Sequence, residues 1–189
     1  MLRRMSRERF LSDSELERLF QVVRARRHVN QPRDYCLLAL LANTGIRPSE
    51  ALALTRDDVH PHARPPWIIL NRTKKPHGPH PNNELILHPK VARVVAAHAD
   101  TLSAGQPLFD FTKRQLARVF KFYAIKSGLG AYRIYALRHS VGMRLWRHTK
   151  DLRVIQAILG HSHLGPAHAY IHVPQERIVQ MYRELGTIG

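Results

Sequence analysis

The sequence has little cysteine, few acids and no long apolar run, and each shortage excludes a class of protein. Cys36 is the only cysteine among 189 residues, so no internal disulfide can form. Its place in the apolar run 35–42 favours a small core residue over a redox centre. No run approaches the ~18 to 20 apolar residues of a membrane span, and residues 1–10 lack a secretory signal core. We therefore expect a cytoplasmic protein without membrane contact.

The shortage of acids leaves a large positive charge. Asp and Glu number 14 against 30 Lys and Arg, which gives a formal net charge of +16 and a pI near 11.0. This excess predicts a polyanionic partner. The basic residues are spread along the chain and do not gather on one amphipathic helix, so they favour nucleic acid over a membrane surface.

Apolar periodicity predicts one domain over residues 1–189 that is mainly α-helical with a small antiparallel β-sheet. Ser12 or Asp13 is expected to cap a first helix. Gln31 and Pro32 open a second helix that is apolar nearly all round, and this pattern predicts a buried central helix. We expect further helices over 49–54, from 89 to about 98, and over 113–127, 135–147, 151–159 and 175–185, with strands over 67–70 and 84–87.

Two arginines, a histidine and a tyrosine occur in an order that suits attack on a phosphate by a phenolic oxygen. A tyrosine hydroxyl ordinarily has a pKa near ~10, so Tyr170 is a poor nucleophile unless positive charge and a hydrogen-bond partner activate it. Arg47 and Arg138 carry planar guanidinium groups, which bind two phosphate oxygens at once. His161 supplies a further donor or a proton-transfer group.

The segment 44–50, Thr-Gly-Ile-Arg-Pro-Ser-Glu, is typical of a tight turn. Gly45 and Pro48 would hold the backbone there and direct Arg47 away from the preceding apolar helix. Glu50 could then fix the guanidinium or a neighbouring imidazole.

These residues lie in segments 44–50, 137–140, 159–162 and 170–173, which resemble the boxes of the tyrosine recombinase, or phage integrase, family. The separations of nine residues from His161 to Tyr170 (170 − 161) and twenty-three from Arg138 to His161 (161 − 138) are of the size that the family uses. The resemblance runs from about 11 to about 182. It implies the family's catalytic-domain fold and DNA strand transfer without metal, ATP or another cofactor.

The resemblance also implies a role for each site residue. Tyr170 would attack a phosphodiester and become joined to the 3′ phosphate. Lys74, in the turn between the second and third strands, would protonate the leaving 5′ oxygen, and the neighbouring lysine stays an alternative. The phosphate would be held by the two arginines, the histidine and a further donor at position 135, with supporting residues around them: Arg47, Arg138, His161 and Tyr135, supported by Glu50, His139 and Lys75.

Two features depart from the family pattern or compete with it. The family usually has histidine three residues before the second arginine, where this chain has Tyr135, a hydrogen-bond donor that carries no positive charge. Near Tyr170 stand His163, His168 and His172, but their spacing matches no helical pair of metal ligands, so we expect no metal site.

The organisation resembles the short form of the family, which lacks the N-terminal core-binding domain. Residues 1–10 would be a basic tail, and the apolar stripe of the helix within 174–189 either packs on its own core or docks on a neighbouring protomer. The implied partners are double-stranded DNA, three further copies in a homo-tetramer on two DNA sites, and accessory DNA-bending proteins in the nucleoid. Type IB topoisomerase and a DNA-binding regulator that does not cut remain the alternative functions.

Overall fold

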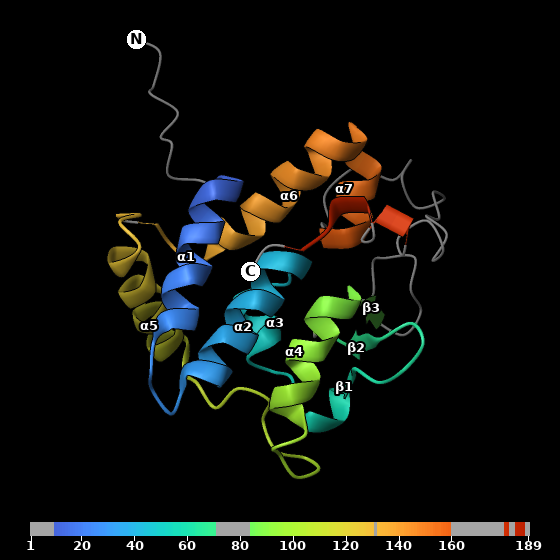
Figure 1. The fold of residues 1–189 in the computed structure, drawn as a ribbon. Coiled ribbons are helices and arrows are strands. Elements are labelled where there is room, and N and C mark those ends of the chain that lie inside the picture. Colours follow the sequence, from blue (N-terminus) through green and yellow to red (C-terminus); the bar gives the residue numbers. More distant parts are fainter. Residues whose placement is uncertain (1–9, 71–83, 131, 160–179, 182–183, 188–189) are drawn as a thin grey trace.

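The computed structural model describes residues 10–70, 84–130, 132–159, 180–181 and 184–187 of the protein (Figure 1). It confirms the predicted fold, which is mainly helical with one small antiparallel sheet of three strands. The elements are, in chain order, α1 (Asp13–Ala25), α2 (Gln31–Thr44), α3 (Pro48–Ala51), the 3-10 turn η2 (Arg56–Asp58), β1 (Val59–His60), β2 (Trp67–Ile69), β3 (Glu84–Ile86), α4 (Pro89–Ala99), α5 (Lys113–Lys126), α6 (Tyr135–Thr149) and α7 (Leu152–Leu159).

The first helix begins at the predicted cap. Ser12 Oγ accepts from the Glu15 backbone N–H at 3.3 Å, and Glu15 Oε2 accepts from the Ser12 N–H at 2.7 Å. This reciprocal pair satisfies two main-chain donors that a helix start otherwise leaves unpaired. The buried residues of α1 form the apolar stripe that faces the core: Leu16, Leu19, Phe20 and Val23.

The second helix is the buried centre that its composition predicts. Figure 1 shows α2 between α1 and α4, with α6 crossing above it, and α2 packs against each of these three helices. Cys36 is fully buried there, which confirms its role as a core residue. Burial raises the pKa of its thiol, so the reactive thiolate is suppressed.

The sheet lies beside α4, and its strand order is β1-β2-β3. In the middle strand Ile68 is opposite Val59 on one side and Leu85 on the other, and it is fully buried. The antiparallel pair β2–β3 confirms the two predicted strands, whereas β1 was not predicted. The basic turn that joins β2 to β3 lies outside the described residues.

The described residues near the C-terminal end pack on the body of the molecule. Residues 180–181 and 184–185 are helical, which agrees with the predicted last helix in this part. Met181 is fully buried in a second apolar cluster, formed with Val141, Leu145, Val154, Ile158 and Leu159. Among the helices within the described ranges, none is both long and apolar enough to cross a membrane.

Candidate active site

The first site arginine follows a glycine that reverses the chain. Gly45 ends α2 with a left-handed φ of 69°, and its N–H donates to Leu41 O at 3.0 Å. This conformation favours glycine, because a Cβ crowds the backbone there. The reversal places Arg47 immediately before α3, as the predicted tight turn requires.

Arg47 is held by Glu50 at two points. The Arg47 backbone N–H donates to Glu50 Oε2 and its Nη1 donates to Glu50 Oε1, both at 2.7 Å. The side chains are 36% exposed for Arg47 and 10% for Glu50, so the carboxylate is the buried member and the guanidinium reaches solvent. A charge-assisted pair of this kind fixes the direction of the guanidinium. Of the two partners considered for Glu50, the guanidinium of Arg47 is thus one that it contacts.

The second site arginine joins two other segments of the chain. Arg138 lies on α6 and is only 7% exposed. Its Nη1 donates to Gly45 O in the turn before Arg47, and its Nη2 donates to Leu159 O at 2.6 Å. A buried guanidinium is stable only where hydrogen bonds replace its water. Arg138 thus brings the turn of Arg47 and the end of α7 to one place.

Close packing reinforces this junction. A Cβ built on Gly45 would lie 2.5 Å from Leu159 Cδ2 and 3.2 Å from Val141, so a side chain here would push Leu159 away from the turn between α2, α6 and α7. A Cβ on Gly142 would meet Leu159 Cδ1 at 3.4 Å. The last side chain of α7 therefore rests directly on the turn that carries the first site arginine.

The remaining described site residues lie on the outer face of α6. Tyr135 begins the helix and is 48% exposed, and His139, one turn later, is exposed as well. Residues four positions apart share one face of a helix. Both side chains are thus open to a ligand that approaches the start of α6.

Four predicted site residues lie outside the described residues: Lys74, Lys75, His161 and Tyr170. Leu159 is the last described residue before His161, and its carbonyl is bound by Arg138. The structure accordingly brings together Arg47, Glu50 and Arg138 with the segment that leads to the histidine.

Sequence reasoning missed two polar side chains that organise α6. Ser140 Oγ accepts from the buried Leu11 N–H at 2.7 Å and donates to Ala136 O at 2.8 Å. The first of these bonds connects the residues just before α1 to the helix that carries Arg138. Arg144 is only 9% exposed. The signal that could have identified it is its place beside Val141 and Leu145 on the core-facing stripe of α6, where a charged residue is unusual.

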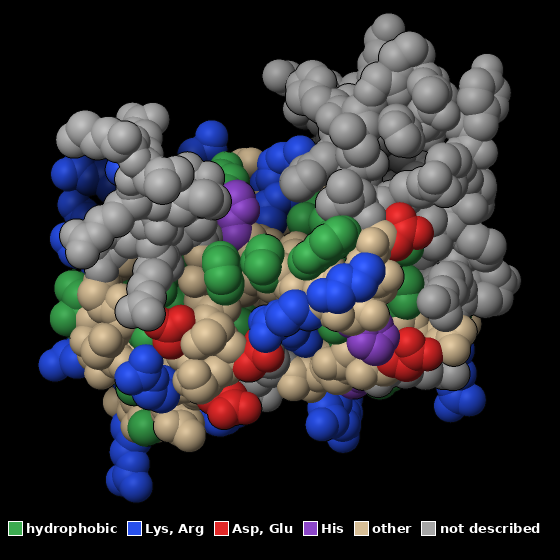
Figure 2. All heavy atoms as spheres, turned by 90° about the horizontal axis from the view of Figure 1, so that it is seen from above, with side chains coloured by type: hydrophobic (Ala, Val, Ile, Leu, Met, Phe, Trp, Pro, Cys, Tyr) green, Lys and Arg blue, Asp and Glu red, His purple; other side chains and the backbone are tan. Residues whose placement is uncertain are grey.

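Basic side chains are prominent on the face seen from above. In this view they project at the left and lower edges and also lie near the centre, with acidic side chains scattered between them (Figure 2). Helix α5 contains no acid, and its exposed basic residues are Lys113, Arg114, Arg118, Lys121 and Lys126. Within the described ranges, no three His, Cys, Asp or Glu side chains gather in a way that could hold a metal ion.

The described part of the candidate site thus consists of Arg47, held by Glu50, and of Arg138, held by the carbonyls of Gly45 and Leu159. The phage integrase family model matches residues 9–177, and the chain belongs to this family. It is 31% identical over 172 residues to tyrosine recombinase XerD of Bradyrhizobium diazoefficiens, which covers 83% of this chain and 54% of that protein. The chain thus spans about half the length of such relatives.

Solved structures show the same fold. XerH recombinase bound to its difH substrate in a pre-cleavage complex aligns with a TM-score of 0.70 at 20% identity, over 96% of this chain and 55% of that one. The catalytic domain of bacteriophage HP1 integrase aligns with a TM-score of 0.57 at 18% identity, over 94% of this chain and 88% of that domain. These likenesses confirm the catalytic-domain fold that the sequence motifs imply.

Proposed function

We propose that the protein is the catalytic unit of a site-specific DNA recombinase of the integrase or invertase type. The observation that carries this proposal is the junction at Arg138, which joins the turn of Arg47 to the end of α7, two residues before His161. Family membership and the +16 charge support DNA as the substrate.

In the proposed reaction, the phenolic oxygen of Tyr170 attacks the phosphorus of a phosphodiester. The new bond joins the protein to the 3′ phosphate, and the bond to the 5′ oxygen breaks. Lys74 gives that oxygen its proton, with Lys75 as the alternative donor. The energy of the broken bond stays in the phosphotyrosyl bond, so resealing needs no ATP.

The phosphate-binding groups would act on the transition state. Its charge spreads over the equatorial oxygens, which Arg47 and Arg138 would each bind, aided by His161 and Tyr135. Removal of one such preorganised donor typically costs on the order of 10² to 10³ in rate. Glu50 would act only by holding Arg47 in place. His139 would support Tyr135, with which it shares the exposed face of α6.

Recombination needs two duplexes and four protomers, so we propose a homo-tetramer with a four-way DNA junction between the two exchanges. In the structure, Met181 packs on its own chain. In the tetramer, we propose that the helix within 174–189 docks on the neighbouring protomer instead. Accessory DNA-bending proteins would assist assembly in the nucleoid.

The test begins with duplexes that the Tyr170→Phe variant selects from a randomised pool. Each selected site is then nicked so that the released 5′ hydroxyl fragment diffuses away and the covalent adduct accumulates. We expect an adduct on a denaturing gel with the unmodified protein and none with Tyr170→Phe, which should bind with the same affinity. The control is Tyr132→Phe, which removes a hydroxyl bound to Glu15 and should keep the adduct.

The outcomes separate the candidate functions. An undiminished adduct with Tyr170→Phe would sink the assignment of the nucleophile. Relaxation of supercoiled plasmid without four-way junctions would indicate a type IB topoisomerase. Tight binding without an adduct from the unmodified protein would indicate a regulator that does not cut.

A further inference from the structure

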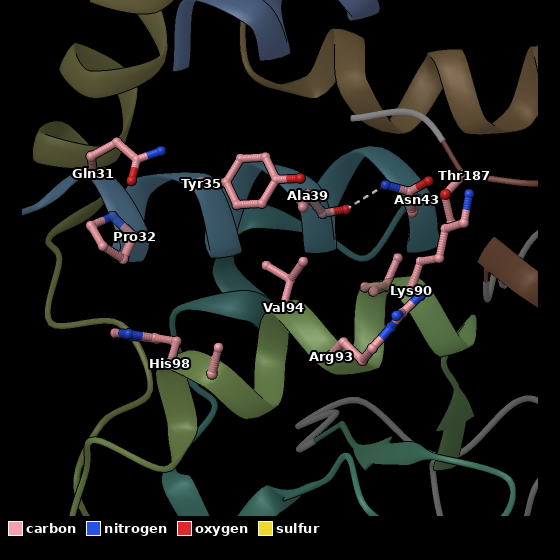
Figure 3. Close-up of a pocket in the computed structure, with 12 residues that line it drawn as sticks. Gln31, Pro32, Tyr35, Ala39, Asn43, Lys90, Arg93, Val94, His98 and Thr187 are labelled. Carbon is pink, nitrogen blue, oxygen red and sulfur yellow. Dashed lines mark hydrogen bonds between the residues drawn. The ribbon is translucent and has the colours of Figure 1, made fainter. Parts of the chain in front are cut away.

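An open groove lies between α2 and α4, and neither site arginine lines it. Its cavity has a volume of about 530 Å³. Figure 3 shows side chains of the two helices on its two sides, with Pro32 and His98 towards one end and Lys90 towards the other. All the lining residues except Thr187 belong to α2 and α4, so the groove does not depend on where the C-terminal helix docks.

The middle of the groove is apolar. Tyr35 and Ala39 line it from α2, and Val94 and Ala97 line it from α4. Ala97 is exposed and Tyr35 and Val94 are half-buried, so part of this surface is open to solvent. Between residues 31 and 43, α2 extends roughly 18 Å, about the length of three helical turns. A groove of this length and character suits the apolar stripe of a short amphipathic helix.

The charge that borders this apolar surface is positive. Lys90 and Arg93 line the groove and are exposed, and across the described ranges neither forms an ion pair with an acid. None of the described lining residues is Asp or Glu. Burial and the nearby charges of Lys90 and Arg93 lower the pKa of His88, so a neighbouring imidazole also experiences this positive potential. A ligand that matches the groove therefore carries negative charge beside an apolar face.

We propose that the groove binds an acidic amphipathic helix of a partner protein. The apolar stripe of that helix would cover Tyr35, Val94 and Ala97, and its carboxylates would meet Lys90 and Arg93. A DNA backbone fits the groove less well, because its phosphates and sugars are bound through hydrogen bonds and charge, which leaves the apolar middle in water. This inference goes beyond the proposed function and does not depend on whether the protein cuts DNA.

The probe is a fluorescein-labelled synthetic peptide of leucine, alanine and glutamate, about 15 residues long, with leucines at i, i+3, i+4 and i+7. The control peptide has glutamine in place of each glutamate and keeps the same apolar stripe. Fluorescence anisotropy at about 0.15 M salt, which screens loose surface attraction, measures binding to the full chain without DNA. We expect the acidic peptide to bind about 10-fold more tightly than the control peptide. No binding, or equal affinities, would overturn the proposal.

A matched pair of variants locates the bound peptide. Ala97→Glu places an acid in the groove, and Ala117→Glu makes the same change at an exposed alanine on the basic helix α5. We expect the affinity for the acidic peptide to fall about 10-fold in Ala97→Glu and to stay nearly unchanged in Ala117→Glu. Equal losses would indicate attraction by the overall charge and would overturn the proposal, as would a loss confined to Ala117→Glu.

A second pair of variants tests the two cations. The double variant Lys90→Gln, Arg93→Gln should lose the preference for the acidic peptide over its control. The double variant Lys113→Gln, Arg114→Gln removes the same two charges from exposed positions on α5 and should keep that preference. Loss of the preference in both double variants would contradict a specific role for the groove.

The selected duplex separates a peptide site from a DNA surface. We expect the labelled peptide to stay bound when the duplex is added. Complete displacement of the peptide would show that the groove faces DNA and would overturn the proposal. Absence of an adduct from the unmodified protein, with peptide binding intact, would count against the proposed function alone.

Discussion

Gly45 is the residue on which the geometry of the arginine pair depends most directly. Its positive φ places Arg47, and its missing side chain admits Leu159. We expect Gly45→Ala to lower the free energy of unfolding by about 2 to 5 kcal/mol, since left-handed backbone strain of about 1 to 2 kcal/mol adds to overpacking of about 1 to 3 kcal/mol. Urea unfolding measures this change.

The matched control is Gly128→Ala. Gly128 has the same φ of +69°, but nothing lies within 4 Å of its added Cβ. It should therefore show the strain alone, at about 1 to 2 kcal/mol. Equal losses in the two variants would contradict the close packing of α7 on the turn.

Glu50 makes a separate prediction at the same scale. Glu50→Gln keeps the shape of the side chain but removes the charge that fixes Arg47. We expect adduct formation to fall about 10-fold as charge-assisted bonds become neutral ones, while DNA affinity stays equal or rises because a negative charge is lost. Glu17→Gln, an exposed change of the same charge on α1, should leave the rate unaltered. A parallel fall of affinity and rate in Glu50→Gln would argue against a positioning role.

Among the elements, α6 contributes both to the candidate site and to the core. Tyr135 and His139 lie on its exposed face, Arg138 is buried, and Ser140 accepts a hydrogen bond from the main chain of Leu11. We expect Ser140→Ala to cost about 1 to 3 kcal/mol, because the buried Leu11 N–H loses its acceptor. Thermal unfolding checks this value.

Ser127→Ala is the control for that loss. Ser127 Oγ donates to Tyr123 O at 2.7 Å, four residues back, just as Ser140 donates to Ala136. Ser127→Ala therefore removes the same kind of local hydrogen bond but leaves the Leu11 N–H with its acceptor. A cost in Ser140→Ala no larger than in Ser127→Ala would show that the tie to Leu11 contributes little.

Local elements were predictable from sequence because their causes are local. Residues close together in the sequence form the capping pair, Ser12 and Glu15, and the apolar stripe of α1. Gly45 likewise marks the end of a helix. Strand β1 was missed, because two residues are too few to show an alternating pattern. The bonds of Ser140 and Arg144 join distant main-chain groups, a donor N–H in the first case and an acceptor carbonyl in the second, and such groups leave no trace in residue type.

For the whole molecule, the charge predicts how DNA binding responds to salt. Release of counterions from ~8 neutralised phosphates implies a log-log slope of about −7 between affinity and salt concentration. Fluorescence anisotropy of a labelled duplex from 50 to 200 mM salt, about the range over which such contacts weaken strongly, measures it. A flat response would contradict a basic surface as the source of affinity.

The bond from Leu11 to Ser140 also governs how the molecule can be joined to others. It fixes the main chain of Leu11 at one turn of the helix that carries Arg138. A domain fused ahead of Phe10 would be attached at this fixed point. Its orientation would depend on the length and stiffness of the linker. Short joints would hold it beside α6, and each added flexible residue would loosen that alignment.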